Sequence, residues 1–115
     1  MVEFALCIVR CPFKESLQFG KYLAVNETRD RGWWIPGGGV DKGETFSMAA
    51  KRECMEEANM DIELKGVLKI EHKASNNSKY KMRVIFYAEP VSLEATNAFK
   101  TEPDSESNEA RWVTQ

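Results

Sequence analysis

Residues 37–60 read GGGVDKGETFSMAAKRECMEEANM, and the rest of the predicted fold is organised around them. Three glycines are followed by a segment with helical periodicity. Thr45 stands just before that segment and is a good N-cap residue. The predicted helix carries small and apolar side chains four residues apart, namely Phe46, Ala50, Cys54 and Ala58. We therefore expect a glycine loop that leads into a helix whose apolar face packs on a sheet.

Three glutamates, Glu53, Glu56 and Glu57, lie in the second half of the same helix. At about 100° per residue they fall within about a third of a turn of one another, so their carboxylates can converge on one point. Acidic neighbours at these spacings repel each other. A bound cation would remove the repulsion, and ligands that are all oxygen favour Mg²⁺ or Mn²⁺. The pattern predicts a divalent-cation site; the alternative is a solvated acidic face.

Six residues of this stretch have a spacing that resembles the Nudix box, the signature of the Nudix hydrolases. They are Gly38, Glu44, Arg52, Glu53, Glu56 and Glu57. A chance match in this register has a probability on the order of one in ten million per starting position. Cys54 stands where the family has an aliphatic residue, and Asn59 where it has glycine. Both keep the expected geometry, because cysteine packs as a small hydrophobe and asparagine tolerates the left-handed conformation that closes a helix.

The resemblance implies an α/β fold of the Nudix type, an α/β/α sandwich with a mixed β-sheet, built by residues 1–115 as a single domain. It implies metal-dependent hydrolysis of a phosphoanhydride bond in a nucleoside diphosphate linked to another group, with Mg²⁺ or Mn²⁺ as cofactor. The partner would be a small nucleotide-type substrate. A noncatalytic, regulatory nucleotide-binding domain of the same family is the alternative.

The resemblance also assigns roles to individual residues. The metal ligands would be three helix glutamates and a carbonyl of the glycine loop: Glu53, Glu56, Glu57 and Gly37. Glu53 would also be the general base. Arg52 would orient the carboxylates, Glu44 would brace the loop or Arg52, and Glu106 would complete the catalytic set. Substrate contacts would come from Gly37, Gly38, Gly39, Lys21 and Trp34.

Three residues outside the box have two possible interpretations each. Glu106 precedes Trp112 by six residues, where many family members carry a further metal ligand or base, but it also lies in an acidic loop. Lys21 begins a predicted strand and either reaches a phosphate or stays solvated. His72 ends a predicted strand, and we expect a surface hydrogen-bonding role rather than a catalytic one.

The substrate is not decided by the box, because these residues act on the diphosphate that many substrates share. The strand at 83–90 followed by the segment 104–107 resembles the eukaryotic enzymes that hydrolyse oxidised guanine nucleotides. ADP-ribose, other nucleoside diphosphate sugars, dinucleoside polyphosphates and inositol pyrophosphates stay open.

Composition restricts the class of protein. The chain has 115 residues, 43% of them hydrophobic, and a net charge of −2, which fits one compact soluble domain without a basic stripe for polymeric nucleic acid. No apolar run of membrane length and no signal peptide is recognisable, so we expect no membrane partner and a cytoplasmic location. Cys7, Cys11 and Cys54 lie in apolar surroundings and are expected to be reduced core thiols rather than zinc ligands with His72.

The rest of the chain predicts a sheet. Apolar and β-branched runs predict the strands 4–9, 21–25, 62–71, 81–88 and 108–114, with a break near Gly66 and a long acidic loop over 92–107. The run at 4–9 is apolar on both faces and should be buried on both sides.

Two pairs of large side chains carry further expectations. One of Trp33 and Trp34 should pack in the core and the other should meet a ligand. Met48 and Met55 should pack under a loop. The sequence ends soon after Trp112, where family members usually continue into a packing helix, so one sheet face is expected to be partly bare.

Overall fold

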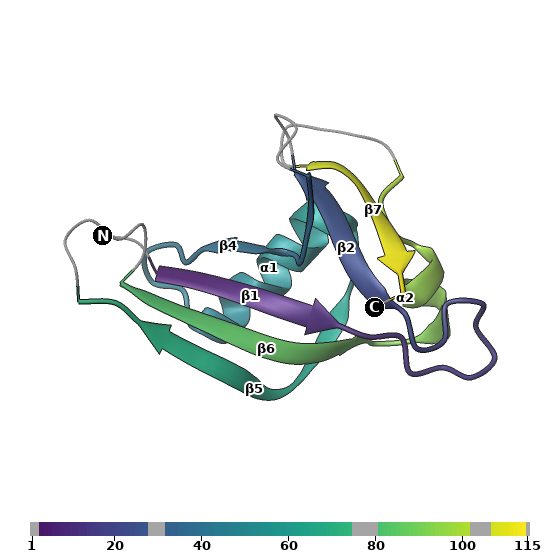
Figure 1. Ribbon diagram of the computed structural model, residues 1–115, viewed down its shortest axis with the longest axis horizontal. Helices are drawn as coiled ribbons and strands as arrows, with labels where there is room; N and C mark the ends of the chain where they lie inside the picture. The colour runs from purple at the N-terminus through teal and green to yellow at the C-terminus, as the bar shows by residue number, and fades with distance from the viewer. Residues whose placement is uncertain (1–2, 28–31, 75–80, 102–106, 115) are drawn as a thin grey trace.

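The structure, a computed structural model, describes residues 3–27, 32–74, 81–101 and 107–114 (Figure 1). Its elements are β1 (Glu3–Val9), β2 (Tyr22–Glu27), β3 (Gly32–Trp34), β4 (Gly37–Gly39), α1 (Phe46–Ala58), β5 (Ile62–His72), β6 (Met82–Pro90), α2 (Leu93–Asn97) and β7 (Ser107–Val113). The predicted strands and the main helix are confirmed, with ends that shift by a few residues. No helix of the described part is long and apolar enough to cross a membrane.

Four strands form a mixed sheet in the order β4-β1-β6-β5, as the α/β prediction required. β1 runs parallel to β6, whereas β4 and β5 run antiparallel to their neighbours. Ala5, Leu6 and Cys7 are buried in succession, which confirms that β1 is covered on both faces. β5 is one continuous strand whose register shifts on both sides of Gly66, so the predicted break is a pair of irregularities in pairing.

Three further strands form a separate antiparallel sheet in the order β3-β2-β7. Val25 pairs with Trp34 on one side and with Ala110 on the other. Because β3 leads directly into β4, the second sheet delivers the chain to the glycine loop. The three glycines, predicted as a loop, form the edge strand β4 of the mixed sheet because their backbone pairs with β1; residues 37–39 keep the name glycine loop.

Helix α1 packs against β1 and β4, and both of its ends are closed by local hydrogen bonds. The Thr45 hydroxyl accepts the Met48 N–H at 3.1 Å, and Asn59 adopts the left-handed conformation with φ 54°. Both predicted end signals are confirmed. The predicted apolar stripe is confirmed as well, with Phe46 against the core and three fully buried members, Ala50, Cys54 and Ala58.

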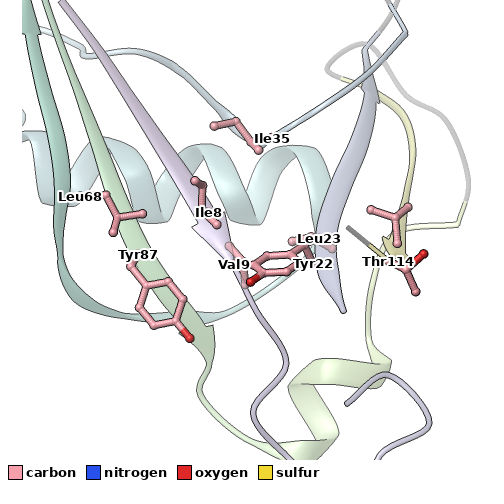
Figure 2. Close-up of a pocket in the computed structure, with 9 residues that line it drawn as sticks. Ile8, Val9, Tyr22, Leu23, Ile35, Leu68, Tyr87 and Thr114 are labelled. Carbon is pink, nitrogen blue, oxygen red and sulfur yellow. The ribbon is translucent and has the colours of Figure 1, made fainter. Parts of the chain in front are cut away.

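The sheet face opposite α1 carries an apolar hollow of about 440 Å³ (Figure 2). It is lined by Ile8, Val9, Tyr22, Leu23, Ile35, Leu68, Tyr87, Val113 and Thr114. Within the described residues α1 is the helix that covers a sheet face, and the five-residue α2 lies beside β7 (Figure 1). Residues of both sheets line the hollow, and the described part shows one helical layer of the predicted sandwich.

The two neighbouring tryptophans do not divide into a core and a surface residue. Trp33 is 37% exposed and Trp34 is 57% exposed, so the prediction that one of them packs in the core is wrong. Both lie on β3, a short strand at the edge of the second sheet. Trp33 instead stacks under the Arg111 guanidinium, 4.0 Å from the ring centroid. The buried tryptophan of this sheet is Trp112.

Two smaller predictions also need correction. Met48 and Met55 are exposed rather than packed under a loop, because they lie on the α1 face that points away from the sheet. The acidic segment 92–107 is not one loop, since it contains α2 at its start. Ser92 caps that helix by accepting the Ala95 N–H at 3.1 Å.

The three cysteines are free and buried, as predicted. Burial raises the pKa of the Cys7 thiol to about 12. Burial also raises the pKa of Cys54, and the nearby Cys7 and Glu57 add to that effect. The Cys7 and Cys54 thiols are therefore protonated at neutral pH, and all three cysteines serve as packing groups.

Candidate active site

The glycine loop lies against β1 so closely that side chains are excluded. Gly37 pairs with Leu6, has φ +156°, and a methyl group added to it would meet the Leu6 side chain and lie 2.5 Å from the Ala5 carbonyl oxygen. The N–H of Gly37 donates to Glu57 Oε1 at 2.7 Å. The loop and the second half of α1 are thereby joined directly.

Gly38 makes room for a carboxylate. A methyl group added there would lie 2.6 Å from Glu53 Oε2, closer than real contacts allow. The absence of a side chain at Gly38 thus lets the Glu53 carboxylate lie against the loop backbone. The sequence placed these two residues in one site, and the structure brings them together.

Arg52 is the centre of the charged cluster. Its Nε and Nη2 donate to the two carboxylate oxygens of Glu44, at 2.7 and 3.0 Å, in the bidentate geometry of a strong pair. Its Nη1 donates to Glu53 Oε1 at 2.7 Å and to Glu56 Oε1 at 3.1 Å. Its Nη2 also donates to the Gly39 carbonyl at 2.9 Å. One guanidinium therefore joins three carboxylates and the glycine loop.

Glu44 braces the loop as well as Arg52. Its Oε1 accepts the Asp41 N–H at 2.9 Å, which closes the turn between β4 and α1. The hydrogen bond from Arg52, together with the Asp41 N–H, lowers the pKa of Glu44. The same bond raises the pKa of Arg52 above its ordinary value. Each group thus stabilises the charged form of the other.

This pair predicts a pH dependence of stability. The folded-state pKa of Glu44 lies below that of the unfolded chain, so its contribution is complete above the unfolded value of about 4.3 and is lost as pH falls through the folded value. Between pH 5 and 3 the unfolding free energy of the wild type should fall more steeply than that of Glu44→Gln. Urea titrations across that range measure it, with Glu63→Gln on β5 as the control. Parallel pH profiles of wild type and Glu44→Gln would contradict the assignment.

The three helix glutamates differ in exposure. The Glu53 and Glu56 side chains are 13% and 37% exposed, and Glu57 is buried at 6%. A buried carboxylate is costly unless it is bonded, and the Gly37 N–H supplies a bond to Glu57. Exposure increases from Glu57 through Glu53 to Glu56, so Glu56 lies nearest the solvent.

The convergence of these carboxylates on one point, expected from helical spacing, is not present in this structure. Within the described residues no three His, Cys, Asp or Glu side chains are arranged to hold a metal ion. The physical reason is that the Arg52 guanidinium bonds to Glu53 and Glu56, while Glu57 turns to the Gly37 N–H. The donor set still fits a hard cation, because carboxylates of one helical turn lie beside the backbone of the glycine loop.

The other predicted site residues are less closely connected. Trp34 is exposed in β3, three residues before Gly37 in the chain. Lys21 precedes β2, and its carbonyl accepts the Cys11 N–H at 3.0 Å. Among the described residues, the Lys21 ammonium forms no hydrogen bond or ion pair with the carboxylates of Glu53, Glu56 or Glu57. Glu106 lies outside the described residues. His72 is exposed at the end of β5.

The sequence did not predict two contacts at the C-terminal end of α1. Lys100 Nζ donates to the Glu56 carbonyl at 3.2 Å, and the Asn59 side chain donates to the Ala98 carbonyl at 2.8 Å. Asn59 could be predicted as a helix end but not as a link to another segment. Nothing in the local sequence of Lys100 indicates its partner.

Comparison with known proteins gives the relatives of this chain. A family model described as "NUDIX domain" matches residues 6–115. The human protein "8-oxo-dGDP phosphatase NUDT18" is 33% identical over 82 residues, 70% of this chain and 23% of that protein. "Putative nudix hydrolase 1" of Caenorhabditis elegans is 32% identical over 80 residues, 70% of this chain and 20% of that protein. The chain thus spans about a fifth of the length of these curated relatives.

Solved structures agree on the fold. The crystal structure of a NUDIX hydrolase from Nitrosomonas europaea has a TM-score of 0.72 to this chain at 25% identity, and the match covers 99% of this chain and 57% of that one. The mixed sheet and the main helix described above are therefore those of this group of structures.

Proposed function

The chain belongs to the Nudix family, and from this premise we propose that it is a metal-dependent hydrolase that cleaves a phosphoanhydride bond in a nucleotide-type substrate. The observation that carries the proposal is the Arg52 cluster, which places three carboxylates beside the glycine loop. An acidic helix face without function has no need for such a loop or for a central arginine.

Each residue of the cluster has a proposed part. Glu53, Glu56 and Glu57 with the Gly37 carbonyl would hold Mg²⁺ or Mn²⁺, which supplies positive charge for the diphosphate and activates water. Glu53 would take the proton from the attacking water. Arg52 and Glu44 would keep these carboxylates oriented without contacting substrate. The backbone of Gly37, Gly38 and Gly39 would contact the phosphates.

Substrate recognition would lie outside the cluster. The exposed ring of Trp34 is available to stack on a base, and Lys21 would contact a phosphate. Glu106 would belong to the catalytic set instead, as a further metal ligand or base. Of the substrates left open by the sequence, oxidised guanine nucleotides come first, because the human relative is named for 8-oxo-dGDP. We propose a cytoplasmic enzyme acting on small molecules.

Cation binding gives the first test. Because a ligand that binds only the folded state stabilises it by mass action, Mg²⁺ or Mn²⁺ at about 100 times its Kd should add about 2.7 kcal/mol and raise the melting temperature by about 10 °C. Thermal melts with MgCl₂, MnCl₂ and NaCl at equal ionic strength measure this. A melt that is indifferent to the divalent cation would count against the site.

Turnover gives the second test. The protein is incubated with Mg²⁺ and a panel comprising 8-oxo-dGDP, dGDP, ADP-ribose, a uridine diphosphate sugar and a dinucleoside tetraphosphate. Release of phosphate or of a nucleoside monophosphate from at least one of them is expected. Cation binding without any hydrolysis would favour the noncatalytic alternative.

A further inference from the structure

The end of α1 is held by a segment far away in the sequence. A helix leaves its last carbonyls without partners inside the helix. In α1 the Asn59 N–H takes the Met55 carbonyl at 2.9 Å, which closes the turn locally. The carbonyls of Glu56 and Ala58 are taken by Lys100, through its Nζ at 3.2 Å and its backbone N–H at 2.7 Å.

Asn59 adds a side-chain link to the same segment. Its amide donates to the Ala98 carbonyl at 2.8 Å, which a glycine at this position could not do. The segment is fixed in turn to the second sheet, because the Lys100 carbonyl accepts the Ala110 N–H of β7 at 2.8 Å. The last turn of α1 is therefore tied to β7 through residues 98–100.

Charge supports the same arrangement. The C-terminal end of a helix carries partial negative charge, which three nearby glutamates increase. α1 has no basic residue in its own last turn. The Lys100 ammonium supplies that positive charge from another part of the chain.

We propose that Lys100 and Asn59 are positioning residues for the carboxylate site. They hold the last turn of α1 so that Glu57 meets the Gly37 N–H and Glu56 stays beside Arg52. The inference rests on the proposed function for its metal-binding consequence, but the Glu57–Gly37 hydrogen bond reports the position of the helix without any metal.

Four variants test this. Lys100→Met keeps the length and the backbone N–H but removes the ammonium, and Lys100→Arg restores a charged donor. Asn59→Gly removes the amide while leaving the left-handed backbone unstrained. Lys51→Met, at an exposed position of α1, is the matched control. Hydrogen exchange of the Gly37 N–H, followed by NMR without metal, and Mn²⁺ affinity, followed by EPR titration, are measured for each.

Lys100→Met should accelerate exchange at Gly37 about tenfold and weaken Mn²⁺ binding by about fivefold, because the last turn opens more often. Lys100→Arg should restore both to within about twofold of wild type, and Asn59→Gly should lie between. Lys51→Met should change neither. Loss of a nearby positive charge alone would strengthen Mn²⁺ binding, so the direction of the change separates positioning from simple electrostatics.

Unchanged exchange at Gly37 in Lys100→Met would overturn the proposal even if the melting temperature falls, since that result describes a stabilising contact and nothing more. Tighter Mn²⁺ binding in Lys100→Met would overturn it as well. A wild type that binds no Mn²⁺ would contradict the proposed function, and the exchange measurement would still decide the positioning role.

Discussion

Glu57→Gln is expected to lower kcat by about 10³-fold, while the melting temperature measured without divalent cation stays within about 3 °C of wild type. Glutamine has nearly the same shape, and its carbonyl oxygen can still accept the Gly37 N–H that Glu57 accepts at 2.7 Å. The fold should therefore survive. The variant loses the negative charge of the most buried of the three helix glutamates, which the proposed cation site would require.

The measurement is steady-state hydrolysis with Mg²⁺, on whichever nucleotide the wild type cleaves. Glu63→Gln makes the same chemical change on β5, at a side chain that is 60% exposed, and should leave kcat unchanged. The cation-induced rise in melting temperature should also shrink in Glu57→Gln. Full activity of Glu57→Gln with Mg²⁺ would remove this residue from the metal ligands.

Gly37→Ala should destabilise the protein more than any other single change in the loop, by about 3 kcal/mol or more. The added methyl group would overlap the Leu6 side chain and approach the Ala5 carbonyl oxygen to 2.5 Å, in a backbone conformation that L-residues rarely adopt. Because β1 is buried on both faces, it cannot retreat. We expect a fall in melting temperature of about 10 °C or more, or no folded protein at all.

Gly66→Ala is the matched control for that variant. Gly66 lies in the exposed part of β5, and a methyl group added there meets nothing within 4 Å. The unfolding free energy of Gly66→Ala should differ from that of the wild type by about 0.5 kcal/mol at most. Thermal and urea melts of the two variants side by side measure the difference. Equal stability of Gly37→Ala and wild type would mean that the loop does not approach β1 as described.

The local rules of the chain predicted a large part of this structure. Thr45 and Asn59 marked the ends of α1, and the stripe through Ala50 and Cys54 marked its buried face, because capping and periodicity depend on residues a few positions apart. The mixed sheet and the Nudix resemblance were also predicted and are confirmed. The direct bonding of Arg52 to Glu44 agrees with the expected bracing role.

The misses concern packing and hydrogen bonds that capping signals and helical or strand periodicity do not describe. Trp33 and Trp34 have equal apolar character, and the local sequence does not indicate which faces of β3 other elements cover. The link from Lys100 to the Glu56 carbonyl spans 44 residues and has no periodic or capping signal. Helical spacing alone predicted that the carboxylates of Glu53, Glu56 and Glu57 converge on one point. It does not account for the hydrogen bonds that Arg52 donates to two of them.

Arg52 also affects whether folding depends on metal binding. Because the Arg52 guanidinium satisfies Glu44, Glu53 and Glu56 from within the chain, mutual repulsion of these acids is offset in the folded protein without a metal ion. Folding then does not wait for an inorganic ion, unlike in small zinc domains whose ligands stay unfolded until metal arrives. The ion would be loaded onto a finished scaffold, and a chelator should silence the protein without melting it.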